Sequence, residues 1–209
     1  MTHFNGNSIL RDLTKQAGYP SLAHLVAKHT LFTHPDTVKQ THNQNLFRII
    51  RNASRRGEMV DYSDGKKVMY CDNEGPNRAF VWSNGGIKYQ DVQLNHIYSD
   101  SQNVNVYTSL ANLCMTPAFI AKLTDTDLEI KALLKYRSFD LYGFYLEKEP
   151  IRPIDYESLN WMPFLPSLTD LEKYLQSRLI SSKKSRSSTS AREIGWLFSN
   201  FEPDKHLIL

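Results

Sequence analysis

The stretch that decides the fold is 87-IKYQDVQLNHIYSDSQNVNVYTSLANLCMTPAFIAKL-123, in the middle of a chain of 209 residues. Its first part, IKYQDVQLNHIY, is typical of an extended strand that ends near Asn95 and His96. The polar piece SDSQNVN follows as a loop. Thr116 is a good N-cap and Pro117 suits the first helical position, where a missing N–H costs nothing. The stretch therefore predicts the order strand, loop, helix, with the helix starting near 117.

The residues before this stretch favour strands and tight turns. Glycine, asparagine and proline punctuate two short runs that are rich in β-branched and aromatic residues. We therefore expect strands at 66–72 (KKVMYCD) and 78–83 (RAFVWS), separated by a turn at 73–76 and followed by a hairpin turn at 84–86.

The opening of the chain has helical periodicity instead. Apolar residues recur at helical spacing over 7–18, 20–32 and 36–53, which predicts three helices. Two interpretations stay open for this section. It is a helix-turn-helix or winged-helix arrangement whose cationic helix ends meet phosphates, or an ordinary helical subdomain with a solvated arginine face.

The second half of the chain carries the clearest helix signal. Thr126 and Glu129 form a capping-box pattern ahead of an apolar run, and Gly143 is placed to end that helix. After it we expect an extended wrap over 150–166, a helix over 168–180, a loop at SSKKSRSSTS and a docked segment at REIGWLFSNF. The prediction is an α+β protein with a helical N-terminal section (1–57), a central core (58–145) and a C-terminal extended and helical wrap (146–209).

Composition excludes several classes of protein. Hydrophobic residues make up 41% and charged residues 22%, which is ordinary for a globular chain. Two isolated cysteines cannot form a disulfide framework or a thiolate zinc site, and no signal-peptide pattern or long apolar run is present. We therefore expect a cytoplasmic protein that does not span a membrane. The chain also lacks a phosphate-binding glycine loop and any repeat.

Basic residues concentrate in two places although the net charge is only +3. We interpret both clusters as surfaces that contact nucleic-acid phosphates. They comprise Arg48, Arg51, Arg55 and Arg56 in the first half, and Lys183, Lys184, Arg186 and Arg192 near the end.

One histidine of the seven stands out. His96 follows a predicted strand, precedes a polar loop and lies 16 positions (112 minus 96) before Asn112. The other six histidines stand alone, and isolated histidines are usually structural or solvated. His96 is therefore the candidate for catalysis.

These residues resemble a known family of enzymes. Asn95-His96-Ile97, the polar loop, then Asn112-Leu113-Cys114 and a following helix are similar to the ββα-metal core of HNH endonucleases. The resemblance covers about residues 66 to 125. It implies a central ββα-metal core in which a histidine takes a proton from water while a divalent metal stabilises the scissile phosphate.

The resemblance also implies roles for individual residues. His96 would be the general base, Asn112 a metal ligand or the residue that braces the loop, and Asn95 a metal ligand. The chain departs from the family because Asn95 replaces a carboxylate and no histidine follows on the helix. A further carboxylate is then needed to hold Mg²⁺ or Mn²⁺. Asp72 is the favoured candidate, ahead of Asp91 and Asp100.

The resulting expectation is a metal-dependent, restriction-type DNA endonuclease that acts on double-stranded DNA. Such enzymes commonly act as homodimers on two-fold symmetric sites. The alternative is a non-catalytic winged-helix-like DNA-binding protein in which His96 is only structural. Asp125 and the Glu129-Ile130-Lys131 pattern superficially fit another nuclease class, but they fall in a predicted helix.

Overall fold

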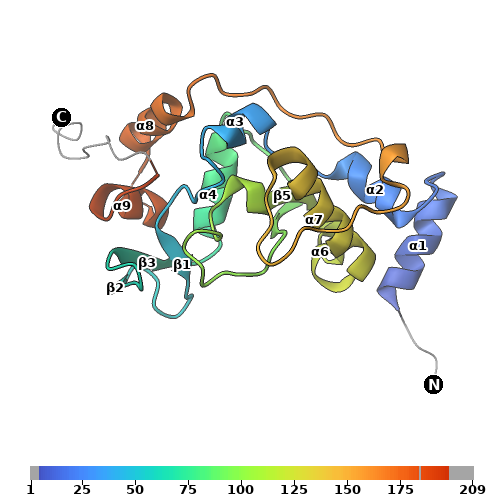
Figure 1. Ribbon diagram of the computed structural model, residues 1–209, viewed down its shortest axis with the longest axis horizontal. Coiled ribbons are helices and arrows are strands. Elements are labelled where there is room, and N and C mark those ends of the chain that lie inside the picture. Colours follow the sequence, from blue (N-terminus) through green and yellow to red (C-terminus); the bar gives the residue numbers. More distant parts are fainter. Residues whose placement is uncertain (1–4, 184, 198–209) are drawn as a thin grey trace.

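The structure, a computed structural model, describes residues 5–183 and 185–197, and it has the α+β fold that the sequence predicts (Figure 1). Its longer helices are α1 Gly6–Gln16, α2 Leu22–His29, α4 Glu74–Ser83, α7 Leu128–Tyr142, α8 Leu171–Ser181 and α9 Arg186–Glu193. Its short helices are α3 Pro35–Lys39, α5 Ala118–Ala121, α6 Leu123–Thr126 and the 3₁₀ turns η1 Leu110–Asn112 and η2 Tyr156–Ser158. Its strands are β1 Ile49–Arg51, β2 Met59–Asp61, β3 Lys67–Cys71, β4 Val92–His96 and β5 Leu113–Pro117.

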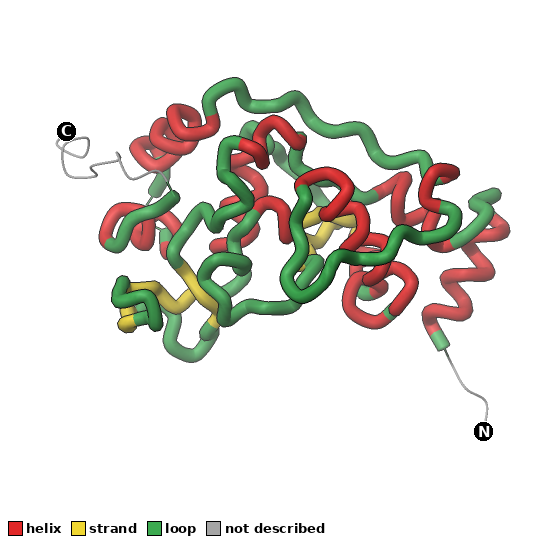
Figure 2. The backbone as a smooth tube through the Cα atoms, in the orientation of Figure 1, coloured by secondary structure: helices red, strands yellow, loops and turns green. Residues whose placement is uncertain are grey.

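Two small sheets carry the strands (Figure 2). In the first sheet β3 is central, parallel to β1 and antiparallel to β2. In the second sheet β4 and β5 form an antiparallel pair in which His96 lies opposite Leu113 and Asn95 opposite Cys114. The backbone of Leu31 pairs with Met115 on the other side of β5, so β5 is bordered on both sides.

The helix predicted to start near 117 does begin there, at Ala118 with Pro117 as its N-cap residue, but it is much shorter than expected and a strand precedes it. Residues 113–117 form strand β5, and only the four-residue α5 follows before α6 and α7. Leu113, Cys114 and Met115 are buried, because β5 lies in the core between β4 and Leu31. The decisive stretch therefore runs strand, long loop, strand, short helices.

The predicted strand at 78–83 is wrong, because these residues belong to helix α4. Asn73 is the N-cap residue and Pro76 lies in the first turn, a position that proline tolerates. Ala79, Phe80 and Trp82 are buried on one side of the helix. The segment that looks like a turn followed by a strand is the beginning of a helix.

Two more predictions need correction. The helix expected over 36–53 ends at Lys39, and residues 49–51 instead form β1 beside β3. The arginines from 48 to 56 are therefore on a strand and loop, and they do not lie on a helix that could read DNA. The loop expected at 181–190 is helical from Arg186 onward, where Ser185 and Ser188 make a reciprocal capping box.

Several other helices and strands agree with the sequence. α1, α2, β3, β4, α7 and α8 lie where the patterns place them, although the N-cap of α7 is Asp127 rather than Thr126. Gly143 ends α7 in the left-handed conformation at φ 65°, which glycine adopts at little cost. The segment 150–166 is extended apart from the η2 turn, as predicted.

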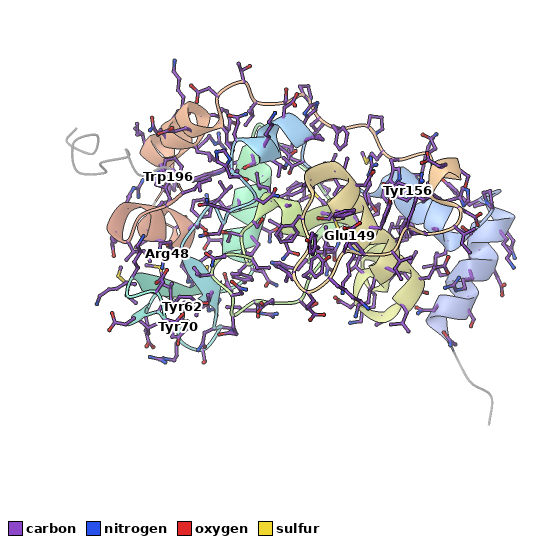
Figure 3. All side chains as sticks on the ribbon, in the orientation of Figure 1. Arg48, Tyr62, Tyr70, Glu149, Tyr156 and Trp196 are labelled. Atoms are coloured by element: carbon purple, nitrogen blue, oxygen red, sulfur yellow. The ribbon has the colours of Figure 1, made fainter. Side chains whose placement is uncertain are left out.

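The molecule is elongated, with α1 and α2 at one end and β1–β3, α8 and α9 at the other (Figure 1). Figure 3 shows Arg48, Tyr62 and Tyr70 at the β1–β3 end and Tyr156 near the opposite end. One large apolar core includes residues of all three predicted ranges, such as Leu25, Leu113 and Leu175. In the part of the chain that the structure describes, no helix has the length and apolar character needed to cross a membrane.

Candidate active site

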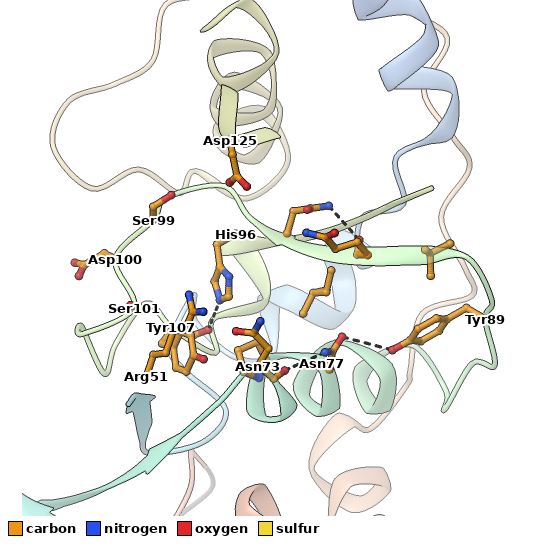
Figure 4. Close-up of a pocket in the computed structure, with 15 residues that line it drawn as sticks. Arg51, Asn73, Asn77, Tyr89, His96, Ser99, Asp100, Ser101, Tyr107 and Asp125 are labelled. Atoms are coloured by element: carbon orange, nitrogen blue, oxygen red, sulfur yellow. Dashed lines mark hydrogen bonds between the residues drawn. The ribbon is translucent and has the colours of Figure 1, made fainter. Parts of the chain in front are cut away.

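His96 is the last residue of β4, where the chain leaves the sheet. Its ring is stacked on the ring of Tyr107, with centroids 5.2 Å apart and planes only 7° from parallel. The Nε2 atom of His96 lies 3.0 Å from the backbone carbonyl oxygen of Tyr107 (Figure 4). Tyr107 is itself fully buried, and its hydroxyl donates to the carbonyl of Asp72 at 2.9 Å. The imidazole is therefore held in one orientation.

This hydrogen bond determines which nitrogen of His96 carries the proton. A carbonyl oxygen can only accept, so the neutral ring must donate from Nε2–H. Nδ1 is then the unprotonated nitrogen, and it has no hydrogen-bond partner among the described residues. A neutral histidine oriented in this way has a lone pair ready to accept a proton.

Asn112 braces the loop between β4 and β5. Its Oδ1 accepts from the backbone N–H of Tyr98 at 2.7 Å, while its Nδ2 donates to the carbonyls of Tyr98 and Val106 at 3.1 and 3.2 Å. The side chain is fully buried. Because all these bonds go to backbone, Asn112 closes the loop directly behind His96. Its side-chain oxygen and nitrogen both form hydrogen bonds to backbone groups, and the residue does not line the cavity. Asn112 therefore fits the bracing role and not that of a metal ligand.

A polar cavity of about 590 Å³ opens beside His96. Figure 4 shows Asp125 of α6 on one side of the imidazole, and Asp100 and Ser99 on the adjacent loop. Arg51, at the end of β1, lies on the other side. Asn73, Asn77, Gln93 and Tyr89 line the rest of the cavity. The cavity thus combines an oriented base, two carboxylates, a cation and several carboxamides.

The surroundings of His96 set its pKa. Burial disfavours the charged imidazolium and lowers the pKa below its ordinary value of 6.5. The hydrogen bond to Tyr107 opposes this shift, Arg51 adds to it and Asp125 weakly opposes it. The neutral form of His96 therefore persists to more acidic pH than in an exposed histidine.

Asn95, which the resemblance proposes as a metal ligand, lines the cavity, but its amide group is bound within the sheet. Its Nδ2 donates to the carbonyl of Gln93 at 3.0 Å and to the hydroxyl of Thr116 at 2.9 Å, and the residue is only 5% exposed. These contacts join β4 to β5. Two carboxylates also line the cavity, and Figure 4 shows Asp125 near His96 and Asp100 farther out on the loop, where its carboxylate accepts from Asn103 at 3.0 Å.

Asp72 lies outside this cavity. Its carboxylate accepts from Arg56 at 2.7 Å and Arg186 at 3.4 Å. Burial works against ionisation, but the amide of Glu74 and these guanidinium groups lower the pKa of Asp72.

In the described part of the chain, one group of three potential ligands lies close enough to share an ion: Cys71, Asp72 and Glu74. Burial raises the pKa of the Cys71 thiol to about 11, which leaves it protonated at neutral pH. Both carboxylates already pair with arginines. This group does not fit a metal.

Most residues of the two basic clusters are engaged within the protein. Arg48 pairs with Asp64, Arg55 with Glu58, and Arg56 and Arg186 with Asp72. Arg192 donates to the carbonyls of Leu179 and Ser182 at the end of α8. Of the cluster residues that the structure describes, Arg51, Lys183 and Arg192 have no carboxylate partner, and Arg192 is held by backbone carbonyls instead. Lys184 lies outside the described residues.

Sequence reasoning located His96 and Asn112 but missed Tyr107 and Asp125. Tyr107 acts through its backbone carbonyl, which leaves no mark in the sequence. Asp125 lies in α6, and its place beside His96 depends on the packing of α5 against the β4–β5 pair and of α6 against α5.

Comparisons with known protein families, with curated proteins and with solved structures found no significant match to this chain.

Proposed function

We propose that this protein is a metal-dependent endonuclease of the HNH-like type that hydrolyses phosphodiester bonds in double-stranded DNA. The observation that carries the proposal is His96 at the end of β4, with Nε2 bound to a backbone carbonyl and Nδ1 facing no partner, beside a polar cavity. Asn112 closes the loop behind it. An oriented neutral imidazole next to carboxylates and a cation suits general-base attack on a phosphodiester.

His96 would take a proton from water at Nδ1, and the resulting imidazolium would remain bound to the Tyr107 carbonyl through Nε2. The lowered pKa keeps the base in its reactive form at neutral pH. Asp125 lies near enough to raise that pKa slightly, so it also stabilises the imidazolium once it forms.

The phosphate would lie between His96 and Arg51. The guanidinium of Arg51 has no carboxylate partner among the described residues, so it is available to an anionic oxygen. The carboxamides of Asn73, Asn77 and Gln93 are groups that can hydrogen-bond base edges. Together these side chains favour a nucleic-acid strand over a small phosphate ester.

The carboxylate of Asp125 would hold the metal together with water and the substrate phosphate, whereas that of Asp100 already accepts from Asn103. Mg²⁺ is commonly bound by one or two carboxylates together with water and substrate phosphates, so this sparse set of ligands fits it. Asp125 is half exposed, and among the described residues it pairs with Lys122 alone, at 3.7 Å. A divalent ion there would neutralise charge on the phosphate and the leaving oxygen.

The test compares the wild type with His96→Gln on plasmid and phage DNA, in Mg²⁺, in Mn²⁺ and in chelator. Glutamine can still donate an N–H toward the Tyr107 carbonyl but cannot act as a base. We expect metal-dependent cleavage by the wild type and loss of about a hundredfold or more in His96→Gln. His24→Ala is the matched control, because the His24 side chain bonds to Ser21 and Ser158 and to no other described residue, and it does not line the cavity.

Three outcomes would contradict the proposal. Intact DNA under every condition, with a retained mobility shift, indicates a non-catalytic binding protein. Full cleavage by His96→Gln removes His96 as the base. Unfolding of both His96→Gln and His96→Ala, seen by circular dichroism, assigns His96 a structural role.

A further inference from the structure

A second hollow lies on the other side of α4 from the candidate active site. It has a volume of about 380 Å³ and is formed by α4, the end of α8 and the segment that leads into α9. α4 packs against α8 and α9, which lie at one end of the molecule (Figure 1). The hollow is lined by three cations, three serines and one tryptophan: Arg78, Arg178, Lys183, Ser181, Ser182, Ser185 and Trp82.

Two of its cations are uncompensated. Arg178 and Lys183 form no ion pair with any carboxylate of the described residues. Arg178 is placed by the turn after α4, since a Cβ atom at Gly86 would lie 3.2 Å from its Nη2 atom. Two uncompensated like charges at one hollow repel each other, and a bound anion relieves this repulsion.

Arg78 supplies a third cation in a fixed position. Its guanidinium lies over the ring of Trp82 at 5.2 Å and donates to Glu74 at 2.9 Å. Its Nε–H is buried and has no hydrogen-bond acceptor among the described residues. Trp82 is only 3% exposed, so it serves to hold Arg78 and is not available to stack on a base.

We infer that this hollow is a phosphate-binding site, separate from the cavity at His96. Arg178 and Lys183 would contact the phosphate oxygens directly. The phosphate is carried either by the backbone of a nucleic acid or by a free nucleotide. The inference does not depend on the proposed nuclease activity, because binding there requires no reaction at His96.

The experiment measures two affinities in the wild type and Arg178→Ala: that for pyrophosphate by calorimetry and that for a short labelled DNA duplex by fluorescence anisotropy. Loss of one charged contact is expected to weaken binding about tenfold. For the duplex, the slope of log affinity against log salt should also fall by about 0.9. Lys173→Ala is the matched control, because it removes the same charge from an exposed position of α8 away from the hollow.

The two arms distinguish the source of the phosphate. Weaker binding of both ligands supports the site and assigns it to a nucleic-acid backbone, whereas weaker binding of pyrophosphate alone supports it and assigns it to a free nucleotide. Values for Arg178→Ala that equal those for Lys173→Ala in both arms would overturn the inference. If Arg178→Ala does not fold, the exposed Lys183→Ala carries the same expectations.

Discussion

Arg51 and Asp125 act on His96 with opposite signs. Burial is the largest cause of the lowered His96 pKa, and Arg51 lowers it further by repelling the imidazolium, whereas Asp125 attracts it. Neither residue touches His96 through a hydrogen bond of the described structure, so each acts through its charge. The protonation of His96 can therefore be tuned without disturbing its contact with Tyr107.

Replacing Arg51 by alanine should raise the pKa of His96. The pKa of the wild-type histidine lies below 6.5, and removal of a repelling cation moves it upward. An NMR titration of the His96 ring measures this shift without any need for catalysis. In a nuclease, activity is lost as His96 becomes protonated on the acidic side, so that limb of the rate profile should move to higher pH. Arg55→Ala, which removes an arginine paired with Glu58, should leave both unchanged; an unmoved midpoint in Arg51→Ala would contradict the assignment.

Asn112 should matter for stability as much as for function. In Asn112→Ala the buried N–H of Tyr98 and the carbonyls of Tyr98 and Val106 lose their partner. Leaving buried backbone groups unpaired should lower the free energy of unfolding by about 2–4 kcal/mol. Urea denaturation gives this value. Asn105→Ala, at an exposed position of the same loop, is the control, and an equal loss in both variants would show that Asn112 does not brace the loop.

At the site, the predictable residues are those whose role lies in the local pattern. His96 after a strand and Asn112 after a polar loop could be singled out from the sequence. Arg51 was expected only as one of four clustered arginines, and nothing local distinguishes it from its neighbours. Its place in the cavity depends on the parallel pairing of β1 with β3, a long-range contact that no periodicity reveals.

At the scale of elements, α4 shows how tertiary contacts override a local rule. Gly75 lies in the first turn of α4, where alanine normally improves a helix. A Cβ atom at this position would lie 1.8 Å from Cδ1 of Ile49, a side chain that is fully buried in the core. The absence of a side chain at residue 75 lets α4 approach β1 closely.

Gly75→Ala should therefore destabilise the protein even though it favours the helix. Overpacking against Ile49 is expected to cost about 1–3 kcal/mol, more than the gain of up to about 1 kcal/mol in helix propensity. Thermal unfolding measures the sum. Gly6→Ala is the matched substitution, because a Cβ at the start of α1 meets nothing within 4 Å. A rise in melting temperature for Gly75→Ala would show that Ile49 moves aside freely.

The elements that sequence patterns placed correctly are those with strong local signals. α7 has a capping residue, an apolar stripe and a glycine stop, and β3 lies between two turns. β5 and α4 were mistaken because short apolar runs such as LCMTP and RAFVWS suit either state. In β5 the choice is made by pairing with β4 and Leu31, which are distant in sequence. In α4, Asn73 at the N-cap and Pro76 in the first turn are signals for a helix. The sequence interpretation gave more weight to the β-propensity of the residues that follow.

At the scale of the whole molecule, the long connection between α7 and α8 joins the two ends of the structure. It runs along the elongated body from the α1–α2 end to the α8–α9 end (Figure 1). Hydrogen bonds hold the connection against the body of the protein. The backbone N–H of Met162 donates to the carbonyl of Ala27, which lies in α2, at 3.0 Å. The amide of Gln40 then donates to the carbonyl of Leu168 and accepts from the N–H of Leu171, at 2.7 and 2.8 Å.

These bonds join residues separated by about 130 positions, so they form only after a very long loop has closed. Leu171, Leu175 and Leu179 of α8 are fully buried in the common core and depend on that closure. The core therefore stays open on one side until α8 docks, although α2, α7 and the β4–β5 pair have formed their own contacts. Long-range closure of this kind slows folding. During synthesis, the apolar surface that α8 covers is exposed to other chains until α8, which follows the connection, has emerged from the ribosome.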